Sequence, residues 1–217
     1  DKNYIYFFTE GPEYSFWGLF DTNIHFFGTK EKAPLFLLGT DKMGRDLLSR
    51  IFYGARVSLS VGLVGVFLSL ILGTTLGSIS GYYGGFIDHF IQRLIELMIS
   101  FPAIPMWMAL AAAVPADWSP IKVYFAVTII LGFVRWGGLA RQIRGMVLSV
   151  REEDYAQAAK SFGASDSFII FKHLVPNVIS HILVIATLSI PRMILGETAL
   201  SFLGLGIRPP MTSWGVL

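Results

Sequence analysis

The 217-residue sequence contains no cysteine, so neither a disulfide bond nor a thiolate metal site can form in it. Its four histidines are scattered, and none has a partner at the i, i+4 spacing that suits a metal site on a helix. Charged residues are also scarce: they make up 15% of the chain, and the formal net charge is +2. Because the basic residues are not massed among aromatic ones, we exclude nucleic acid as a partner.

The sequence also lacks the motif G-x-x-x-x-G-K-[ST], whose backbone cradles nucleotide phosphates. We therefore expect no nucleotide site, no cofactor, no metal and no catalytic residue in this chain. Apolar side chains are abundant, with 53% hydrophobic residues and a mean hydropathy of +0.60. A typical soluble domain carries about 25% charged residues. The composition predicts an all-α fold, a polytopic bundle of transmembrane helices.

Four segments are long and apolar enough to be predicted as membrane-crossing helices. They cover approximately residues 57–80, 87–114, 121–140 and 175–200. No charged residue occurs between Arg56 and Asp88, and a helix there, at about 1.5 Å per residue, can cross a hydrocarbon core of about 30 Å. The third segment is the least apolar, and its Arg135 should face the interior of the bundle or water.

Small residues recur every fourth position in the first of these segments, at Gly73, Gly77 and Gly81. Such a face allows a second helix to approach closely, and packing distance governs helix association in lipid. We therefore predict a buried helix contact along this face, and no ligand site.

The second segment carries polar residues near its start and prolines further on. Asp88 with Gln92, and Arg93 with Glu96, have spacings that allow pairing along one helix, which would lower the cost of placing them near the membrane. Pro102 and Pro105 lack a backbone donor, and the helix should kink at these prolines.

Residues 1–56 contain no run that is long and apolar enough to span a bilayer, and they are rich in aromatic residues. We expect this segment to lie outside the hydrocarbon, on the extracytoplasmic side. The helical spacing of Leu47, Leu48, Ile51 and Phe52 predicts an amphipathic helix on the membrane surface. No N-terminal signal is visible, which indicates that a first membrane helix precedes this segment.

A polar stretch at residues 149–174 separates the third and fourth predicted spans. Ser149 and Glu152 have the spacing of a capping box, so we predict a helix over about residues 150–162. Gly163 can adopt the left-handed conformation that ends it. Ser165 can then begin a second helix, which meets the last span at its first proline.

Four residues of this stretch and the first proline after it keep a fixed spacing: Gln157, Ala158, Ala159, then Gly163 after three residues and Pro176 after twelve more. This series resembles the EAA loop of permease subunits in bacterial ABC importers. In that family the loop forms the coupling helix, which sits in a groove of a cytoplasmic ATPase. The resemblance implies an ATPase-coupling role for Tyr155, Ala156, Gln157, Ala158, Ala159, Gly163 and Pro176. Gln157 stands where the family usually has glutamate.

Three further stretches, residues 38–62, 81–102 and 196–215, resemble permeases of the dipeptide and oligopeptide importers, in particular the partner called the C-type subunit. The resemblance covers roughly residues 38–215. It implies the permease fold of type I ABC importers over residues 57–217. It also implies that the first and last helices of that family lie outside this chain.

The resemblance implies ATP-driven import of short peptides across the bacterial cytoplasmic membrane. The implied partners are a sister permease, two cytoplasmic ATPases that bind ATP and magnesium, an extracytoplasmic substrate-binding protein and the peptide itself. Basic residues cluster around the polar stretch, which the positive-inside rule places in the cytoplasm. Nickel chelates and antimicrobial peptides are alternative cargoes within the family. An ion channel or an intramembrane enzyme is the alternative from another class.

Two charged residues lie in the last predicted span. Arg192 and Glu197 are five residues apart, about 140° around a helix, so they cannot easily pair with each other. One interpretation places them, with Arg135, on the translocation path, where Arg192 would meet a peptide carboxylate. In the other, Arg192 reaches lipid headgroups and Glu197 forms hydrogen bonds inside the bundle.

Overall fold

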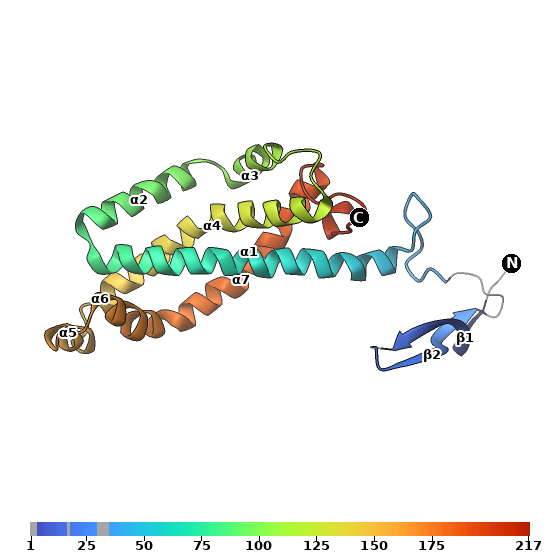
Figure 1. Ribbon diagram of the computed structural model, residues 1–217, viewed down its shortest axis with the longest axis horizontal. Coiled ribbons are helices and arrows are strands. Elements are labelled where there is room, and N and C mark those ends of the chain that lie inside the picture. Colours follow the sequence, from blue (N-terminus) through green and yellow to red (C-terminus); the bar gives the residue numbers. More distant parts are fainter. Residues whose placement is uncertain (1–3, 17, 30–34) are drawn as a thin grey trace. The chain divides into compact units, whose positions relative to one another are not determined.

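The computed structural model describes residues 4–16, 18–29 and 35–217, and the chain divides into two compact units, residues 1–50 and 51–217. The elements in chain order are β1 (Ile5–Phe16), β2 (Phe20–Thr29), α1 (Leu47–Tyr83), α2 (Gly85–Ser100), α3 (Ala103–Ala112), α4 (Pro120–Val150), α5 (Asp154–Ser161), α6 (Asp166–Phe168), a π-helical segment (Ile169–Leu174), α7 (Val175–Phe202) and a 3-10 turn (Trp214–Val216) (Figure 1). The protein is therefore mostly helical.

The first unit contains a two-stranded antiparallel hairpin, so the expectation of an all-α chain is wrong for this segment. Residue Ile5 of β1 pairs with Thr29 of β2, and Phe16 pairs with Phe20. Aromatic residues, which are frequent in both strands, favour extended backbone. Gly18 has a φ of 72°, a left-handed conformation that glycine adopts without strain, and it allows the chain to reverse.

A tight turn centred on Asp41 precedes α1 in the same unit. The Asp41 carboxylate accepts hydrogen bonds from the backbone nitrogens of Met43, at 2.8 Å, and Arg45, at 3.0 Å. It also forms ion pairs with the side chains of Arg45 and Arg50. The backbone bond from Arg45 is the largest of the effects that lower the Asp41 pKa to about 2. The turn is therefore built around an ionised carboxylate.

The expected amphipathic surface helix is not a separate element. Leu47 to Phe52 form the first turns of α1, which continues without interruption to Tyr83. No proline occurs in this helix, so no backbone donor is missing along its length. The helix therefore begins ten residues before residue 57, where the first span is predicted to start.

Three helical segments of the described chain are long and apolar enough to cross a membrane: Leu47–Tyr83, Pro120–Val150 and Asp166–Phe202. The pair α2 and α3 meets the same criteria jointly but is bent by 86° between its two halves. Phe101, the residue before Pro102, is extended, as steric contact with a following proline favours. The sequence predicts one kinked helix here, and the structure contains two helices joined at this proline.

The two helices of the bent pair lie along α4 (Figure 1). Ile95 of α2 belongs to a buried cluster with Ala140 of α4, whereas Trp107 of α3 belongs to a second cluster with Leu131 of α4. As α2 and α3 run forward, their contacts move toward the beginning of α4. The two short helices together therefore span the same depth of the bundle as the middle of α4.

The glycine face of α1 packs against α4. A Cβ atom added to Gly77 would lie 2.5 Å from the backbone oxygen of Ala140, so only glycine fits. Added Cβ atoms at Gly73 and Gly81 would likewise lie within 3.0 Å of α4 atoms. The four-residue spacing thus lies at a close helix contact, in which backbone and side chains of α4 occupy the space that larger residues would need.

The helix α4 is longer than the predicted third span, because it continues beyond residue 140 to Val150. Its extension is stabilised by packing: Ile143 and Val147 are fully buried in a cluster with Leu174 and Val178. In the second unit, α5 and α6 lie at the same end as the connection between α1 and α2, and the C-terminal turn lies near α3 (Figure 1). The polar stretch is therefore grouped at one end of this helical unit.

Candidate functional site

The candidate site begins where α4 ends, and the predicted capping box is wrong. Ser149 lies inside the last turn of α4, and Glu152 forms an ion pair at 2.8 Å with the neighbouring Arg151. The next helix, α5, starts at Asp154 with Glu153 at its N-cap and no side-chain capping bond. Packing of the apolar face of α4 therefore carries that helix through the position at which the local capping signal predicts a start.

The helix α5 is short, and its alanines have different surroundings. Ala156 is 3% exposed and packs with Ile169 and Ile170 of the following segment, whereas Ala158 is exposed. Ala159 is half-buried. A small residue is needed at position 156 because residues 169 and 170 of the returning chain pack against it. Ala158 has a short side chain on the outer surface of α5, so a partner can approach the helix closely there.

The helix α5 forms the first arm of a helical hairpin, residues 154–174, and α6 with the π-helical segment forms its return arm. Gly163 ends the first arm in the left-handed conformation, with a φ of 79°. Its backbone nitrogen donates to Lys160 at 3.0 Å, and the nitrogen of Ala164 donates to Ala159 at 3.1 Å. These bonds satisfy carbonyl groups that the end of α5 would otherwise leave unpaired. The glycine therefore fixes the direction in which the chain returns.

The return arm runs into the membrane helix without a break. The backbone nitrogen of Val175 donates to the oxygen of Ile170, the spacing of a π-helix, and Pro176 lies in the first turn of α7. A wider turn before a proline provides space for its ring, which would clash with a carbonyl in a regular helix. The sequence predicts a second helix that meets the last span at Pro176, and in the structure one helical segment extends from Asp166 to Phe202. The return arm and α7 are therefore mechanically continuous.

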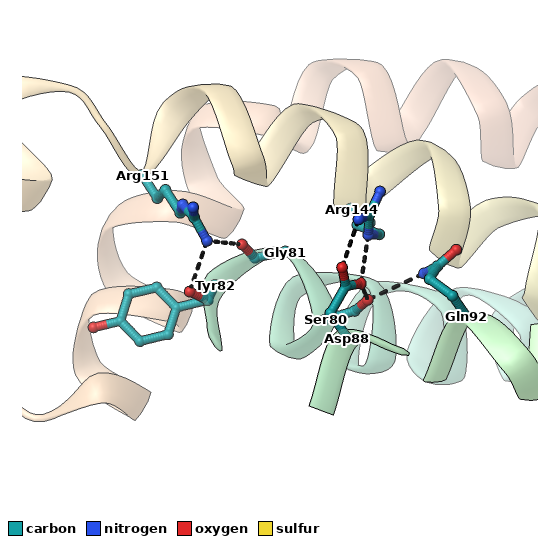
Figure 2. A network of polar contacts seen from close by, with 7 residues as sticks. All are labelled: Ser80, Gly81, Tyr82, Asp88, Gln92, Arg144 and Arg151. Carbon is teal, nitrogen blue, oxygen red and sulfur yellow. Dashed lines mark hydrogen bonds and ion pairs between the residues drawn. The ribbon is translucent and has the colours of Figure 1, made fainter. Parts of the chain in front are cut away.

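Hydrogen bonds connect this hairpin with the end of α1 (Figure 2). The Nη1 atom of Arg151 donates to the backbone oxygens of Gly81, at 2.8 Å, and Tyr82, at 3.1 Å. The Tyr82 hydroxyl in turn donates to Asp166 at 2.8 Å. Gln157 donates from Nε2 to the backbone oxygen of Arg151 at 2.9 Å. The end of α1 is therefore bonded to residues before and after α5.

A partly buried ion pair lies next to these bonds. Arg144 of α4 donates from Nε and Nη2 to the two carboxylate oxygens of Asp88, each at 2.5 Å (Figure 2). Ser80 donates to Asp88 at 2.5 Å, and Gln92 donates to Ser80 at 3.1 Å. Sequence reasoning predicts a local pair of Asp88 with Gln92 and misses this tertiary one. Opposite charges at the ends of two apolar segments were the available signal.

The pairing predicted between Arg93 and Glu96 is confirmed, at 3.1 Å. Both side chains are largely exposed, with 77% and 54% of their surfaces accessible. Ion pairs this exposed contribute little to stability. This exposed pair is therefore a suitable control when the contribution of the partly buried pair of Asp88 and Arg144 to stability is measured.

Aromatic side chains are exposed on the otherwise polar hairpin. Phe162 is 91% exposed, Phe171 51%, Phe168 49% and Tyr155 38%. Partial burial is the largest effect that raises the Tyr155 pKa, and the nearby Glu153 carboxylate adds to it. Tyr155 is therefore neutral near pH 7. A cleft of about 480 Å³ lies beside α5, with Arg151, Gln157 and Lys160 among its lining residues. Apolar anchors beside a polar cleft suit a protein partner.

The structure brings two of the three charged membrane residues together. Arg135 of α4 and Arg192 of α7 line one cavity of about 90 Å³, to which α1 also contributes. Glu197 is fully buried elsewhere and accepts hydrogen bonds from Ser58, at 3.0 Å, and Ser201, at 2.6 Å. Its contacts are thus those expected for a carboxylate that holds helices together inside the bundle.

Metal chemistry has no obvious location in the described residues, since no group of three histidine, aspartate or glutamate side chains there is arranged to hold an ion. The exposed hairpin and the arginine-lined cavity are therefore the two candidate sites. The first offers protein-binding groups, and the second offers positive charge within the helical unit.

Comparison with known proteins places this geometry in a family. Residues 73–217 match the model of the "binding-protein-dependent transport system inner membrane component". Among similar curated proteins, the oligopeptide permease OppC of Haemophilus influenzae is 42% identical over 82% of this chain. The dipeptide permease DppC of Bacillus subtilis is 40% identical over 82%, and the glutathione permease GsiD of Pectobacterium atrosepticum is 38% identical over 83%.

The chain spans about half the length of these relatives, namely 56%, 54% and 58% in the same order. The family match covers residues 73–217, which include the ion pair, the hairpin and both membrane arginines. These residues thus lie in the part of the chain that the family model describes. The chain belongs to the family of inner membrane components of binding-protein-dependent transport systems.

Proposed function

We propose that this protein is the permease subunit of an ATP-driven importer that moves short peptides across a bacterial cytoplasmic membrane. The observation that carries the proposal is the family match, together with a hairpin whose exposed face is available to a partner. The names of its relatives refer to oligopeptide, dipeptide and glutathione transport. These three cargoes share a peptide backbone, which defines the expected substrate class.

Energy must come from other subunits, because the sequence has no phosphate-binding motif. Two cytoplasmic ATPases bind ATP and magnesium, and their closing motion pushes α5 and its neighbours, Tyr155 to Gly163. The return arm transmits this motion to α7 because the two form one helical segment. Arg151 and Tyr82 transmit it to α1 through the hydrogen bonds at the base of the hairpin. The chain itself therefore transmits motion and lines the translocation path, and it is not an enzyme.

The orientation of the protein in the membrane follows from the distribution of its basic residues. Arg141, Arg144, Arg151, Lys160 and Lys172 lie in or beside the hairpin, so the positive-inside rule places this end in the cytoplasm. In the proposed topology α2 and α3 form one of four crossings, so the segment before α1 and the end of α7 lie outside. A substrate-binding protein delivers peptide on that side. A sister permease covers part of the apolar helix surface, and lipid covers the rest.

Uptake by the assembled transporter in proteoliposomes tests the proposal. Labelled dipeptides, longer peptides, glutathione and a nickel chelate are offered with the binding protein, with and without ATP on the ATPase side. We expect peptide accumulation only with ATP and only when the permease is present. Accumulation of the nickel chelate alone would overturn the cargo assignment. Conductance or catalytic activity that persists without ATP would instead support a channel or an intramembrane enzyme.

A further inference from the structure

The cavity between α1, α4 and α7 contains two positive charges. Arg135 of α4 and Arg192 of α7 both line it, although they are 57 positions apart in the sequence. Arg135 lies near the middle of a 31-residue helix, about 22 Å from either end at ~1.5 Å per residue. A charged side chain at this depth of a membrane is costly unless it faces water, a partner or a ligand. A second arginine in the same cavity adds repulsion to that cost.

Nothing in the described chain neutralises this pair. No aspartate or glutamate lines the cavity, and the five ion pairs of the described residues all involve other arginines. Glu197, one turn and a half beyond Arg192, has its carboxylate oxygens engaged by Ser58 and Ser201. The remaining polar lining consists of Ser69, Gln142 and Ser189, which are uncharged. The cavity therefore has an unmet preference for an anion.

We propose that Arg135 and Arg192 form a carboxylate-binding subsite of the translocation path, which takes the C-terminal carboxylate of the peptide. The inference rests on the proposed function and deepens it. Guanidinium groups bind carboxylates through paired, charge-assisted hydrogen bonds. A cavity of about 90 Å³ has room for a terminal carboxylate and none for a whole peptide. Every unmodified linear peptide has this group, so the subsite recognises peptides regardless of their side chains.

A lipid phosphate presents similar oxygen chemistry, and the test separates it from the peptide. The assembled transporter, reconstituted in vesicles, is given one peptide in two forms, with a free C-terminal carboxylate and with a C-terminal amide. The binding protein is the same for all variants, so its own preference cancels when the ratio of the two initial uptake rates is compared. The variants are Arg135→Gln and Arg192→Gln, with Arg135→Lys and Arg192→Lys as charge-preserving changes. Arg93→Gln, in the exposed surface pair, is the matched control.

We expect either glutamine variant to lower the ratio of acid to amide uptake about tenfold, as for loss of one charge-assisted hydrogen-bonded contact. Uptake of the amide should be unchanged, which shows at once that the variants fold and assemble. In the lysine variants the ratio of acid to amide uptake should remain close to that of the unaltered transporter. In the Arg93→Gln control it should be unchanged. Equal slowing of both peptides would overturn the subsite, because it means that the arginines serve lipid or structure. Failure of the unmodified transporter to import either peptide would overturn the proposed function itself.

Discussion

Among single residues, Asp88 has the clearest structural role, because it neutralises Arg144 where α1, α2 and α4 meet. Replacing Asp88 with Asn preserves its shape but leaves the arginine without a countercharge. The two side chains are 29% and 12% exposed, so the loss should be smaller than for a fully buried pair, about 2 kcal/mol. Thermal unfolding of the purified permease in detergent should show this as a lower Tm.

The exposed pair provides the control for this experiment. Removal of Arg93 by substitution with Gln should change the unfolding free energy by less than about 0.5 kcal/mol. A double variant, Asp88→Asn with Arg144→Gln, should lose less stability than the sum of its single changes, because no unpaired charge remains. An Asp88→Asn protein as stable as the parent would show that the ion pair does not hold the three helices together.

Gly77 is the tightest point between α1 and α4. In a Gly77→Ala variant the new methyl group would lie 2.5 Å from a backbone oxygen of α4, which cannot turn aside. The helices must separate locally, at a cost of about 1–3 kcal/mol. Gly145→Ala on α4 is the control, since nothing lies within 4 Å of its added Cβ and alanine favours a helix. Equal Tm values for the two variants would contradict the close contact.

Asp41 gives a pH-dependent prediction. Its folded pKa of about 2 lies below the ordinary 3.8, so the turn is fully stabilised above pH 3.8 and loses that stabilisation as the pH falls through 2. A carbon-13 titration of the assigned Asp41 carboxyl group should show a midpoint near pH 2. Gly44→Ala, which strains a residue with a φ of 74°, should raise that midpoint toward 3.8. A midpoint of 3.8 in the unaltered protein would contradict the bonded turn.

Residue patterns in the sequence revealed only part of this chemistry. The spacing of Gly73, Gly77 and Gly81 is visible because helical periodicity alone places them on one face. The pair of Asp88 and Arg144 is not visible, because its members are 56 positions apart and meet only through the packing of two helices. Arg135, Arg192 and Glu197 could all be named as candidates from the sequence, but only the structure shows that the two arginines line one cavity and that Glu197 lies outside it.

At the scale of elements, Gly163 controls the shape of the coupling hairpin. Gly163→Ala meets no atom within 4 Å, so its whole effect is backbone strain at a φ of 79°, about 1–2 kcal/mol. Amide hydrogen exchange in residues 154–164 should become roughly tenfold faster. Gly163→Asn should recover part of the protection, because asparagine tolerates this conformation. Unchanged exchange in the alanine variant would show that the left-handed turn is not needed.

Element boundaries were harder to predict from the sequence than element types. The sequence indicates that the second helix meets the last span at Pro176, but it does not indicate the π-helical turn that joins the two without a break. The N-terminal β-hairpin was missed because its aromatic, strand-forming residues are interspersed with polar ones and form no long apolar run. The capping signal at Ser149 was overridden by tertiary packing of α4, which no local pattern reports.

At the scale of the whole molecule, the helical unit combines an exposed hairpin at one end with an anion-attracting cavity among its long helices. In the proposed importer these features have complementary tasks, since the hairpin receives motion and the cavity contacts cargo. The fold class and the family resemblance were predictable because composition and the EAA spacing are properties of the chain alone. The sharp bend between α2 and α3 could be recognised only from the structure.

In the proposed importer, a separate ATPase docks on the hairpin that contains α5. Because the sequence has no cysteine, single cysteines can be placed at Ala158 and Phe162, and at Trp118 between α3 and α4 as a control. Crosslinking in the assembled, import-competent transporter is the most direct test. We predict permease–ATPase adducts from positions 158 and 162 and none from position 118. Adducts from position 118 alone, or none from the hairpin in a transporter that still imports peptide, would contradict the account.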